Sequence, residues 1–439
     1  MPRRCLFFLL AILVWSRAAQ AESRRSFFFG GEASISAASL IANVRGPDAL
    51  FYNPAGLGGL DRDSLNLSLS AFTTRFTRIE NGYTVRFGTE ELSENLSFNE
   101  FLPVPSALVY VRQITPTISA ALGIYVVESS DLRLDARIEG ADVPVGDQEL
   151  DIRTGLDVQE LRTTYNVGVG LGWRITQNLH MGGGLYVLYE RRISSTLLFT
   201  SRETGAGTSD STLLTSDDDI KSAGFRASYG LQWSPVRGLH LGLALHSPSV
   251  GVYTWGTSLP VTTVAADGLT VLQAEQVELS DFDVEFIQPF LAEAMLSLDL
   301  DAWTLGATFE VGAPLETDRF SFDALWNLRL GATYQAKPTL KFGAGFFTDR
   351  ASARSLTEPN LPEEVDFYGW TLGAFFKTFL NEEKTVAFTS SFGLLYRYGR
   401  GQVNALTLDP TSLVPTVILE PQRSIVHEAA LNVGSGIEY

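Results

Sequence analysis

The chain has 439 residues, 45% of them apolar, and its 50 acidic and 33 basic residues give a formal charge of −17. This apolar content is too high for an intrinsically disordered chain, and the negative charge argues against a protein that wraps nucleic acid. Charged residues make up only 19% and aromatic residues 11%, yet no internal run of about 18 apolar residues is present to form a membrane helix. This combination is typical of a transmembrane β-barrel, which forms one domain even at this length.

The N-terminus has the features of a secretory signal peptide. Arg3 and Arg4 precede an apolar run at residues 6–15, and residues 19–21 form a small-x-small cleavage site. This run is too short to span a bilayer, so a membrane anchor is the weaker interpretation. We expect residues 1–21 to be removed with Cys5, which leaves no disulfide, zinc-thiolate site or thiol nucleophile. The mature charge is then −20, because 30 basic residues remain against 50 acidic ones.

From about residue 63 onward, apolar and polar residues alternate over long stretches. A period of two is the pattern of a β-strand with one apolar and one polar face. The stretches predict fourteen antiparallel strands, at 64–78, 104–114, 118–136, 156–175, 179–200, 219–234, 238–257, 282–299, 302–313, 324–335, 339–348, 365–379, 384–400 and 424–439.

Short and long connections between these strands alternate along the chain. The short ones, such as 176–178 and 336–338, have turn-forming residues. The long ones are polar and acidic, and they lie at 79–103, 201–218, 258–281 and 401–423. Bacterial outer-membrane barrels have this asymmetry, with tight periplasmic turns and long outer loops. We expect 217–219 to be a solvated acidic run in one loop and 269–279 to be a short amphipathic helix in another.

The two faces of the predicted strands differ in an unusual way. In the strand at 156–175, one face has Tyr165, Val167, Val169, Leu171 and Trp173, and the other has Asn166, Gly168, Gly170, Gly172 and Arg174. The apolar face carries the larger side chains, as expected where a strand faces lipid. A soluble β-sandwich is the alternative, but it does not need such long strands or aromatic residues near strand ends, which suit membrane interfaces.

Glycines on the inward face gather near the short turns, for example Gly172, Gly182 and Gly345. Glycine weakens a strand and is kept where another backbone must come close. One interpretation is that these glycines only let a small barrel curve. The other is that they receive a plug at the periplasmic end of the lumen. Residues 22–60 lack strand alternation and are rich in Ala, Ser and Gly, so they are the candidate plug.

The most specific string of the chain lies in this candidate plug, at residues 46–57, and contains Asn53-Pro54-Ala55. It resembles the FadL-type family of outer-membrane transporters for long-chain fatty acids and other hydrophobic compounds, whose N-terminal hatch carries an Asn-Pro-Ala motif. The resemblance continues through residues 241–248, which end in Ser-Pro, and through residues 330–334. Tyr439 is similar to the terminal aromatic residue that barrel-assembly machinery reads.

The resemblance implies an all-β fold, a 14-stranded antiparallel transmembrane β-barrel with an N-terminal hatch inside the lumen. The expected divisions are a signal peptide at 1–21, the hatch at 22–62 and the barrel at 63–439. The implied function is passive uptake of hydrophobic small molecules such as long-chain fatty acids by a monomer in the outer membrane of a Gram-negative bacterium. Its other partners would be outer-membrane lipid, lipopolysaccharide and the assembly machinery. A structural or secretion partner for exported proteins and a general porin are the alternatives.

Three groups of residues are candidates for function. Asn53, Pro54 and Ala55 are predicted to hold the hatch against the barrel wall, although an ordinary turn has the same residues. Phe27, Phe28 and Phe29 are expected to contact an acyl chain or to seal the plug. The inward cations, among them Arg174 and His246, either meet a carboxylate head group or pair with acidic residues of the lumen and hatch.

No feature of the sequence indicates catalysis. There is no Gly-x-Ser-x-Gly elbow and no histidine pair with the spacing of a metal site on a helix. We therefore expect neither an enzyme nor a metal or cofactor site, and no nucleic-acid partner. Pro289 interrupts the strand predicted at 282–299, because a proline cannot donate to a ladder, and a bulge or local break is expected there.

Overall fold

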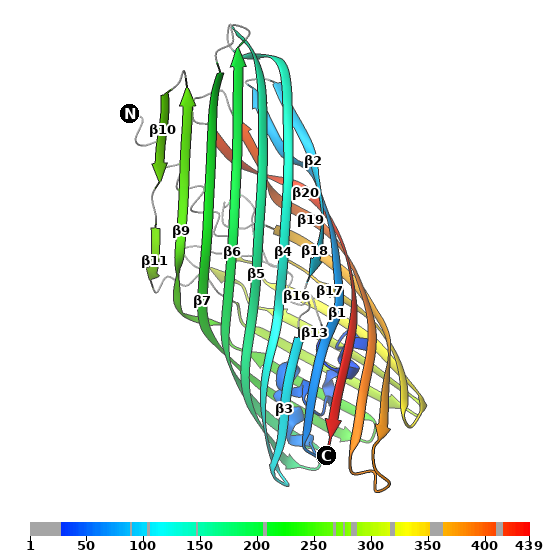
Figure 1. Cartoon of the computed structure of the whole chain (residues 1–439). Coiled ribbons are helices and arrows are strands. Elements are labelled where there is room, and N and C mark those ends of the chain that lie inside the picture. The colour runs from blue at the N-terminus through cyan, green and yellow to red at the C-terminus, as the bar shows by residue number, and fades with distance from the viewer. Residues whose placement is uncertain are drawn as a thin grey trace.

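The computed structural model describes residues 28–87, 90–102, 106–145, 148–204, 209–266, 269–274, 277–281, 288–316, 321–351, 363–409 and 416–439. The expected signal peptide and Phe27 lie outside these ranges. Nearly all of the described chain is β-strand, and the strands form one tall, closed wall around a short N-terminal segment (Figure 1). None of the helices in these ranges is long and apolar enough to cross a membrane.

The main sheet has eighteen strands: β1 (Ser64–Phe87), β2 (Glu90–Leu102), β3 (Ser106–Thr115), β4 (Ile118–Val145), β5 (Gln148–Thr176), β6 (Leu179–Thr204), β7 (Ser209–Val236), β8 (Leu239–His246), β9 (Val250–Ala266), β10 (Leu269–Ala274), β11 (Val277–Asp281), β12 (Leu291–Leu300), β13 (Trp303–Gly312), β16 (Leu325–Lys337), β17 (Leu340–Asp349), β18 (Glu363–Phe379), β19 (Ala387–Asp409) and β20 (Thr416–Glu438). A separate pair is formed by β14 (Leu315–Glu316) and β15 (Ser321–Phe322).

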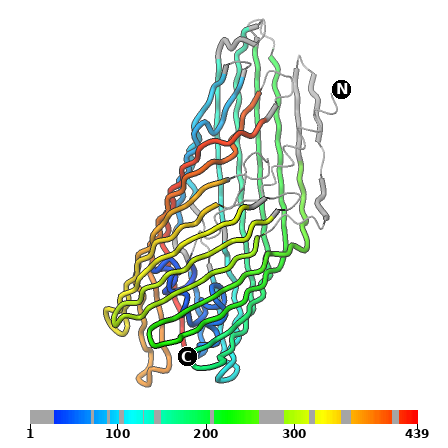
Figure 2. The backbone as a smooth tube through the Cα atoms, turned by 180° about the vertical axis from the view of Figure 1, so that it is seen from behind, coloured from blue at the N-terminus to red at the C-terminus, as the bar shows by residue number. Residues whose placement is uncertain are grey.

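The main sheet closes on itself through antiparallel pairs. Pairing runs in chain order from β3 to β8, passes to β12, and continues through β13, β16, β17, β18 and β19 to β20. β20 then pairs with β1, and the first part of β1 pairs with β3. The result is a barrel in which β4 to β7 rise well above the shorter strands β12 to β17, as the view from behind shows (Figure 2).

The predicted number of fourteen strands is wrong, because fifteen of the described strands of the main sheet have ten residues or more. The stretch predicted at 238–257 is divided into β8 and β9 around Pro248, which has no N–H for the ladder. In the stretch predicted at 282–299, β12 begins only at Leu291, after Pro289. Gln288, Pro289 and Phe290 are not part of a strand, and residues 282–287 lie outside the described residues.

The four predicted outer loops are also wrong, since most of their described residues belong to strands. Residues 79–103 lie largely in β1 and β2, and 401–423 largely in β19 and β20. The acidic run 217–219 is part of β7, and the predicted helix at 269–279 is replaced by β10 and β11. In these upper parts the outer face of the strands is polar, so the alternation that was used to find strands does not reveal them.

The N-terminal segment, residues 28–63, is not part of the sheet. It contains α2 (Gly31–Ile35), η1 (Ile41–Asn43), α3 (Asp48–Tyr52) and η2 (Pro54–Gly59). These short helices contact β4 to β8 on one side of the ring and β12, β13 and β17 to β20 on the other. The segment therefore fills the end of the barrel at which the chain terminates (Figures 1 and 2).

Candidate functional site

Two rows of aromatic side chains mark the outside of the barrel. Trp173 and Tyr165 on β5, like Tyr334 and Trp326 on β16, are eight residues apart and all exposed. The rows continue across strands, since Trp303 lies 4.9 Å from Tyr334 between ring centroids. Eight residues extend about 26 Å along a strand, or about 20 Å in height at the usual tilt, which is the scale of the apolar band of an outer-membrane barrel.

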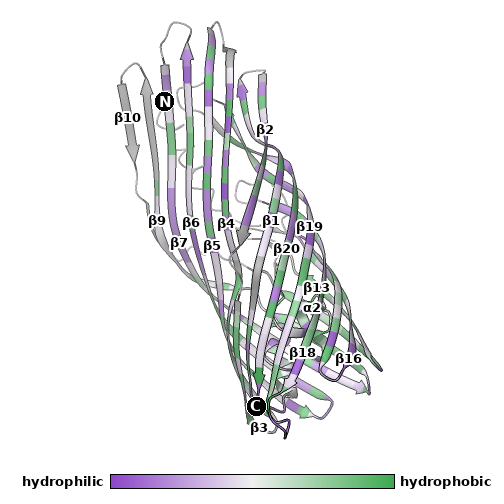
Figure 3. Cartoon of the chain, turned by 45° about the vertical axis from the view of Figure 1, so that its right-hand side comes forward, coloured by the Kyte–Doolittle hydropathy of each residue, from purple (hydrophilic) through white to green (hydrophobic). Residues whose placement is uncertain are grey.

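The polarity of the wall reverses above the upper aromatic row. Between the rows, β5 exposes Val167, Val169 and Leu171 and faces inward with glycines. Above Tyr165 the same strand exposes Asp151 and Arg153, whereas Ile152 and Leu156 are buried inside. Hydrophobic and hydrophilic residues are interleaved along the strands in Figure 3. The upper wall is thus built to face water outside and apolar groups inside.

The inward glycines accept the backbone of the N-terminal segment. A Cβ atom on Gly172 would overlap Leu57 and Gly58, one on Gly182 would overlap Pro54, and one on Gly345 would overlap Ser36. Gly306, Gly331 and Gly343 are in the same situation with residues 35–39. The prediction that these glycines allow close backbone approach is confirmed, and barrel curvature alone does not explain them.

Asn53 joins this segment to the wall. Its side-chain amide donates to the carbonyl of Leu231 on β7 at 3.2 Å, while its Oδ1 accepts from the backbone N–H of Ala55. Pro54 occupies the first position of η2, where its missing N–H has no cost. Asn53, Pro54 and Ala55 are all buried.

The inward cations Arg174 and His246 lie beside acidic residues of the N-terminal segment and the lumen, which is the second of the two interpretations given above. Arg174 donates to the carbonyls of Gly58 and Leu60 and forms an ion pair with Asp61 at 2.7 Å. His246 lies 3.7 Å from Glu293 and is buried. Arg174 therefore fastens the N-terminal segment near the strand ends, whereas His246 lies beside Glu293 on the other side of the segment.

Inside the barrel, a belt of buried charged residues lies just above the N-terminal segment. Arg162 pairs with Glu190, and Arg329 pairs with both Glu293 and Glu310. Arg397 pairs with both Asp349 and Glu428. Arg75 pairs with Glu428 as well as with Glu100. Several of these charges are two residues further up their strands than a side chain that contacts the segment. Leu395 below Arg397 and Phe347 below Asp349 are examples. Paired charges are the form in which ions are tolerated in a protein interior.

Aromatic rings form a floor directly beneath this belt. The rings of Phe28 and Phe347 are 5.0 Å apart, and Phe29 contacts both Phe51 and Tyr125. Phe347 is the strand partner of Arg329. The Nη1 atom of Arg329 is buried and has no hydrogen-bond partner among the described residues. A spare cationic donor thus borders an apolar floor, which is the arrangement that suits the head and tail of an amphiphile.

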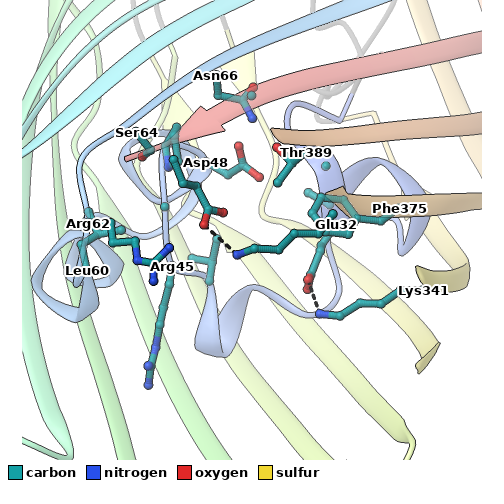
Figure 4. A pocket seen from close by; sticks show the side chains of 18 of the residues that line it. Glu32, Arg45, Asp48, Leu60, Arg62, Ser64, Asn66, Lys341, Phe375 and Thr389 are labelled. Atoms are coloured by element: carbon teal, nitrogen blue, oxygen red, sulfur yellow. Dashed lines mark hydrogen bonds and ion pairs between the residues drawn. The ribbon is translucent and has the colours of Figure 1, made fainter. Parts of the chain in front are cut away.

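A cavity of about 680 Å³ lies on the other side of the N-terminal segment, between it and the strand ends. Glu32 forms an ion pair with Lys341 there, and the two side chains point toward one another in Figure 4. Burial and the nearby charge of Glu32 raise the pKa of Asp48 to about 7, although a hydrogen bond from the backbone of Gly31 lowers it. No group of metal-ligating side chains comes together in the described part of the chain.

Among the predicted site residues, Phe28 and Phe29 are brought to the floor of the lumen, whereas Phe27 lies outside the described residues. Sequence reasoning missed Arg329, Arg397 and Phe347. Arg329 lies two residues before the inward Gly331, and side chains two residues apart on a strand point to the same face. The sequence was therefore sufficient to predict that the Arg329 side chain points inward.

Comparison with known proteins places the fold. No family model and no curated relative matches the sequence. Among solved structures, a Pseudomonas aeruginosa FadL homologue covers 94% of this chain and 98% of its own, with 15% identity and a TM-score of 0.58. The P. putida toluene transporter TodX covers 94% of this chain and 99% of its own, with 14% identity and a TM-score of 0.59. The CymD monoaromatic hydrocarbon channel covers 90% of this chain and 94% of its own, with 12% identity and a TM-score of 0.52. The chain therefore has the fold of the FadL-type channels.

Proposed function

We propose that this chain is an outer-membrane channel for the passive uptake of hydrophobic small molecules, with long-chain fatty acids as the favoured substrate class. The observation that carries the proposal is the spare donor of Arg329 beside the ring of Phe347 and the buried ring of Phe28. A carboxylate accepts well from an arginine, and an acyl chain gains by covering aromatic surface. Solved structures of the same fold, which are a FadL homologue, a toluene transporter and a monoaromatic hydrocarbon channel, support a channel for hydrophobic molecules.

The membrane location is part of the proposal. The two exposed aromatic rows and the aliphatic residues between them suit the two interfaces and the core of an outer membrane. The N-terminal segment then acts as a hatch that closes the periplasmic end. Glu32, Arg174 and Asn53 anchor it to three parts of the wall. A lumen occupied in this way favours a small hydrophobic substrate over the wide aqueous channel of a general porin.

We place the exit of the substrate in the side wall next to the aromatic floor. The ladder of β3 and β4 ends upward at the pair Ala107 and Tyr125. Above that pair, β2 pairs with β1 but forms no ladder with β4 among the described residues. Tyr125 touches Phe29 and Phe51. Among the described residues, β2 thus lies against β4 without a ladder in the part of the wall beside the floor.

Uptake by cells tests the function. A Gram-negative host without its own fatty-acid channel would produce the protein or carry the empty vector, and would receive labelled oleate, labelled toluene or a labelled disaccharide. We expect faster uptake of oleate and toluene than with the vector, and no change for the disaccharide. Faster uptake of the disaccharide instead would support a porin, and rates equal to the vector for all three compounds would contradict the proposal.

A further inference from the structure

The outer end of the barrel contains an unusual strand exchange. β1 pairs with β20 as far as Ile79, and its register with β2 then shifts between Ile79 and Tyr83. Asn81 in this interval has a left-handed backbone, with a φ of 50°. Beyond it, β1 leaves β20 and pairs with β19 over three residues, from Tyr83 to Val85. This is the one parallel ladder among the described residues of the main sheet, and it bends the tip of the β1–β2 hairpin toward the barrel interior.

The hairpin tip reaches the facing wall of the barrel. The hydroxyl of Tyr83 hydrogen-bonds to the hydroxyl of Thr154 on β5, and both residues are buried. Apolar side chains surround this bond, and they come from β1, β2, β4, β5, β6, β7 and β19: Val85, Leu96, Ala136, Ile138, Ile152, Leu156, Leu198, Leu214 and Leu408. The inner face of the tall wall and the hairpin tip therefore close the outer part of the lumen between them.

The remaining attachments of the tip are weak. Arg86 pairs with Glu420, and Arg423 with Glu80, but these side chains are about a third to a half exposed. Exposed ion pairs contribute little, and salt screens them. The other edge of the hairpin, β2, has no ladder to β4 among the described residues. The described attachments of the tip are thus a short ladder, an apolar contact, the packing of β2 against β4, exposed ion pairs and one buried hydrogen bond.

We propose that the upper part of the β1–β2 hairpin, residues 83–86 with their partners 91–94, is an outer gate of the lumen, with its hinge at Asn81 and Gly82 and its latch at the bond between Tyr83 and Thr154. The gate lies well above the charged belt and the N-terminal segment, so it controls access from outside and not release below. A hydrophobic molecule can separate the gate from the facing wall, because its own contacts with the apolar lining replace those that are lost. A polar solute makes no such contacts, so it does not stabilise the open gate. The inference rests on the proposed function, because a gate has a purpose only in a channel.

Labelling of a reporter cysteine tests the latch without any substrate. Asn166→Cys places a thiol in the lumen below the gate, in a protein whose Cys5 is replaced by Ser. The rate of reaction with a water-soluble maleimide is measured for Tyr83→Phe, Thr154→Val and the double variant in this background. Tyr396→Phe is the matched control, because its hydroxyl bonds to His427, outside the lumen.

We expect each latch variant to react about fivefold faster, which corresponds to the loss of one ordinary hydrogen bond. The double variant should react no faster than either single variant, since both remove the same bond. Tyr396→Phe should react at the original rate. Unchanged labelling in Tyr83→Phe, or equal acceleration by Tyr396→Phe, would overturn the proposal. Thermal unfolding of each variant identifies a general loss of stability, which would accelerate labelling in the control as well.

A disulfide lock tests whether the gate must move. Val85 and Leu408 are partners in the parallel ladder, so cysteines at the two positions lie within the range of a disulfide. Thr74→Cys with Ala429→Cys makes the control crosslink between β1 and β20 below the hinge. Oxidation of the Val85→Cys/Leu408→Cys protein should reduce oleate uptake to the vector rate, and a reductant should restore it, while the control crosslink has no effect. Full uptake by the oxidised, crosslinked gate would overturn the proposal. If the original protein itself takes up no oleate, the proposed function fails, and the labelling rates alone decide the gate.

Discussion

The side-chain amide of Asn53 donates a hydrogen bond to the backbone carbonyl of Leu231, 178 residues further along the chain. This bond crosses from the N-terminal segment to β7 at a fully buried position, where Gly230 leaves room for the Asn53 side chain. One residue of the Asn-Pro-Ala string therefore contributes directly to the attachment of the segment to the barrel.

Replacement of Asn53 by Ala should loosen the N-terminal segment. The carbonyl of Leu231 loses its side-chain partner in a buried environment, which costs about 1–3 kcal/mol. We expect faster hydrogen exchange in residues 48–60, with the barrel strands unchanged, and a different rate of oleate uptake at equal surface level. Asn178→Ala, in an exposed turn, is the control. Identical exchange in the two variants would show that Asn53 does not hold the segment.

The adjacent glycines Gly182 and Gly183 provide a sharper test of how the segment docks, because a side chain at one position would point to the opposite face of the strand from a side chain at the other. Gly182 faces the carbonyl of Pro54, whereas a Cβ on Gly183 would meet only the carbonyl of Ser228, at 3.7 Å. Gly182→Ala should displace the segment and lower the unfolding temperature by several degrees, since a rigid backbone cannot yield to the new methyl group. Gly183→Ala should leave the temperature within a degree or so. Equal effects would mean that strand propensity, and not the segment, requires glycine at position 182.

Docking of the segment should depend on pH through Asp48. Its pKa rises from an ordinary value of 3.8 to about 7 in the folded protein. The folded state therefore holds a proton that the unfolded state loses, so the contribution of Asp48 to stability is present at low pH and is lost as the pH rises through about 7. The segment of the original protein should resist proteolysis better at pH 5 than at pH 8, and Asp48→Asn should reduce this difference. An equal pH dependence in the variant would assign the effect to another group.

Arg329 should distinguish acidic from neutral substrates. Arg329→Lys keeps the charge beside Glu293 and Glu310 but loses the planar fork that offers a spare donor. We expect oleate uptake to fall about tenfold at low concentration, as for one lost charge-assisted bond, and toluene uptake to stay within a factor of two. Arg162→Lys, on the far side of the belt, should change neither. A parallel loss for oleate and toluene would indicate a structural role for Arg329.

Sequence alternation predicted the parts of the strands that lie between the two aromatic rows. It missed the upper parts, where the outer face of the wall is polar. Between the aromatic rows, alternation identified the strands and their faces, as Val167 and Gly168 illustrate, because the exposed outer face carries large apolar residues and the inner face receives the N-terminal segment. Above Tyr165 the outer face meets water, so the rule used to find strands ceased to apply. The extended β4 to β7, the strand with residues 217–219, and the β-structure at 269–279 were lost for this reason.

The candidate site was only partly accessible from sequence. The glycines indicated where the N-terminal segment lies, since close backbone approach leaves a trace in residue type. Arg329 and Phe347 left no such trace, because their importance depends on register: they are partners on β16 and β17, and Phe28 reaches them from more than 300 positions earlier. Alternation gives the direction of a side chain but not its neighbour on the next strand.

Photocrosslinking of a fatty acid to the protein in outer membranes tests the central claim most directly. A long-chain fatty acid with a diazirine in the part of the chain near its carboxylate would be activated by light, and the labelled peptides identified by mass spectrometry, with unlabelled oleate as competitor. The proposed site predicts competed labelling of Phe28, Phe347 and the inward residues beside them, such as Leu395. Labelling confined to lipid-facing residues such as Val169 and Leu171, and not reduced by oleate, would contradict a substrate site inside the barrel.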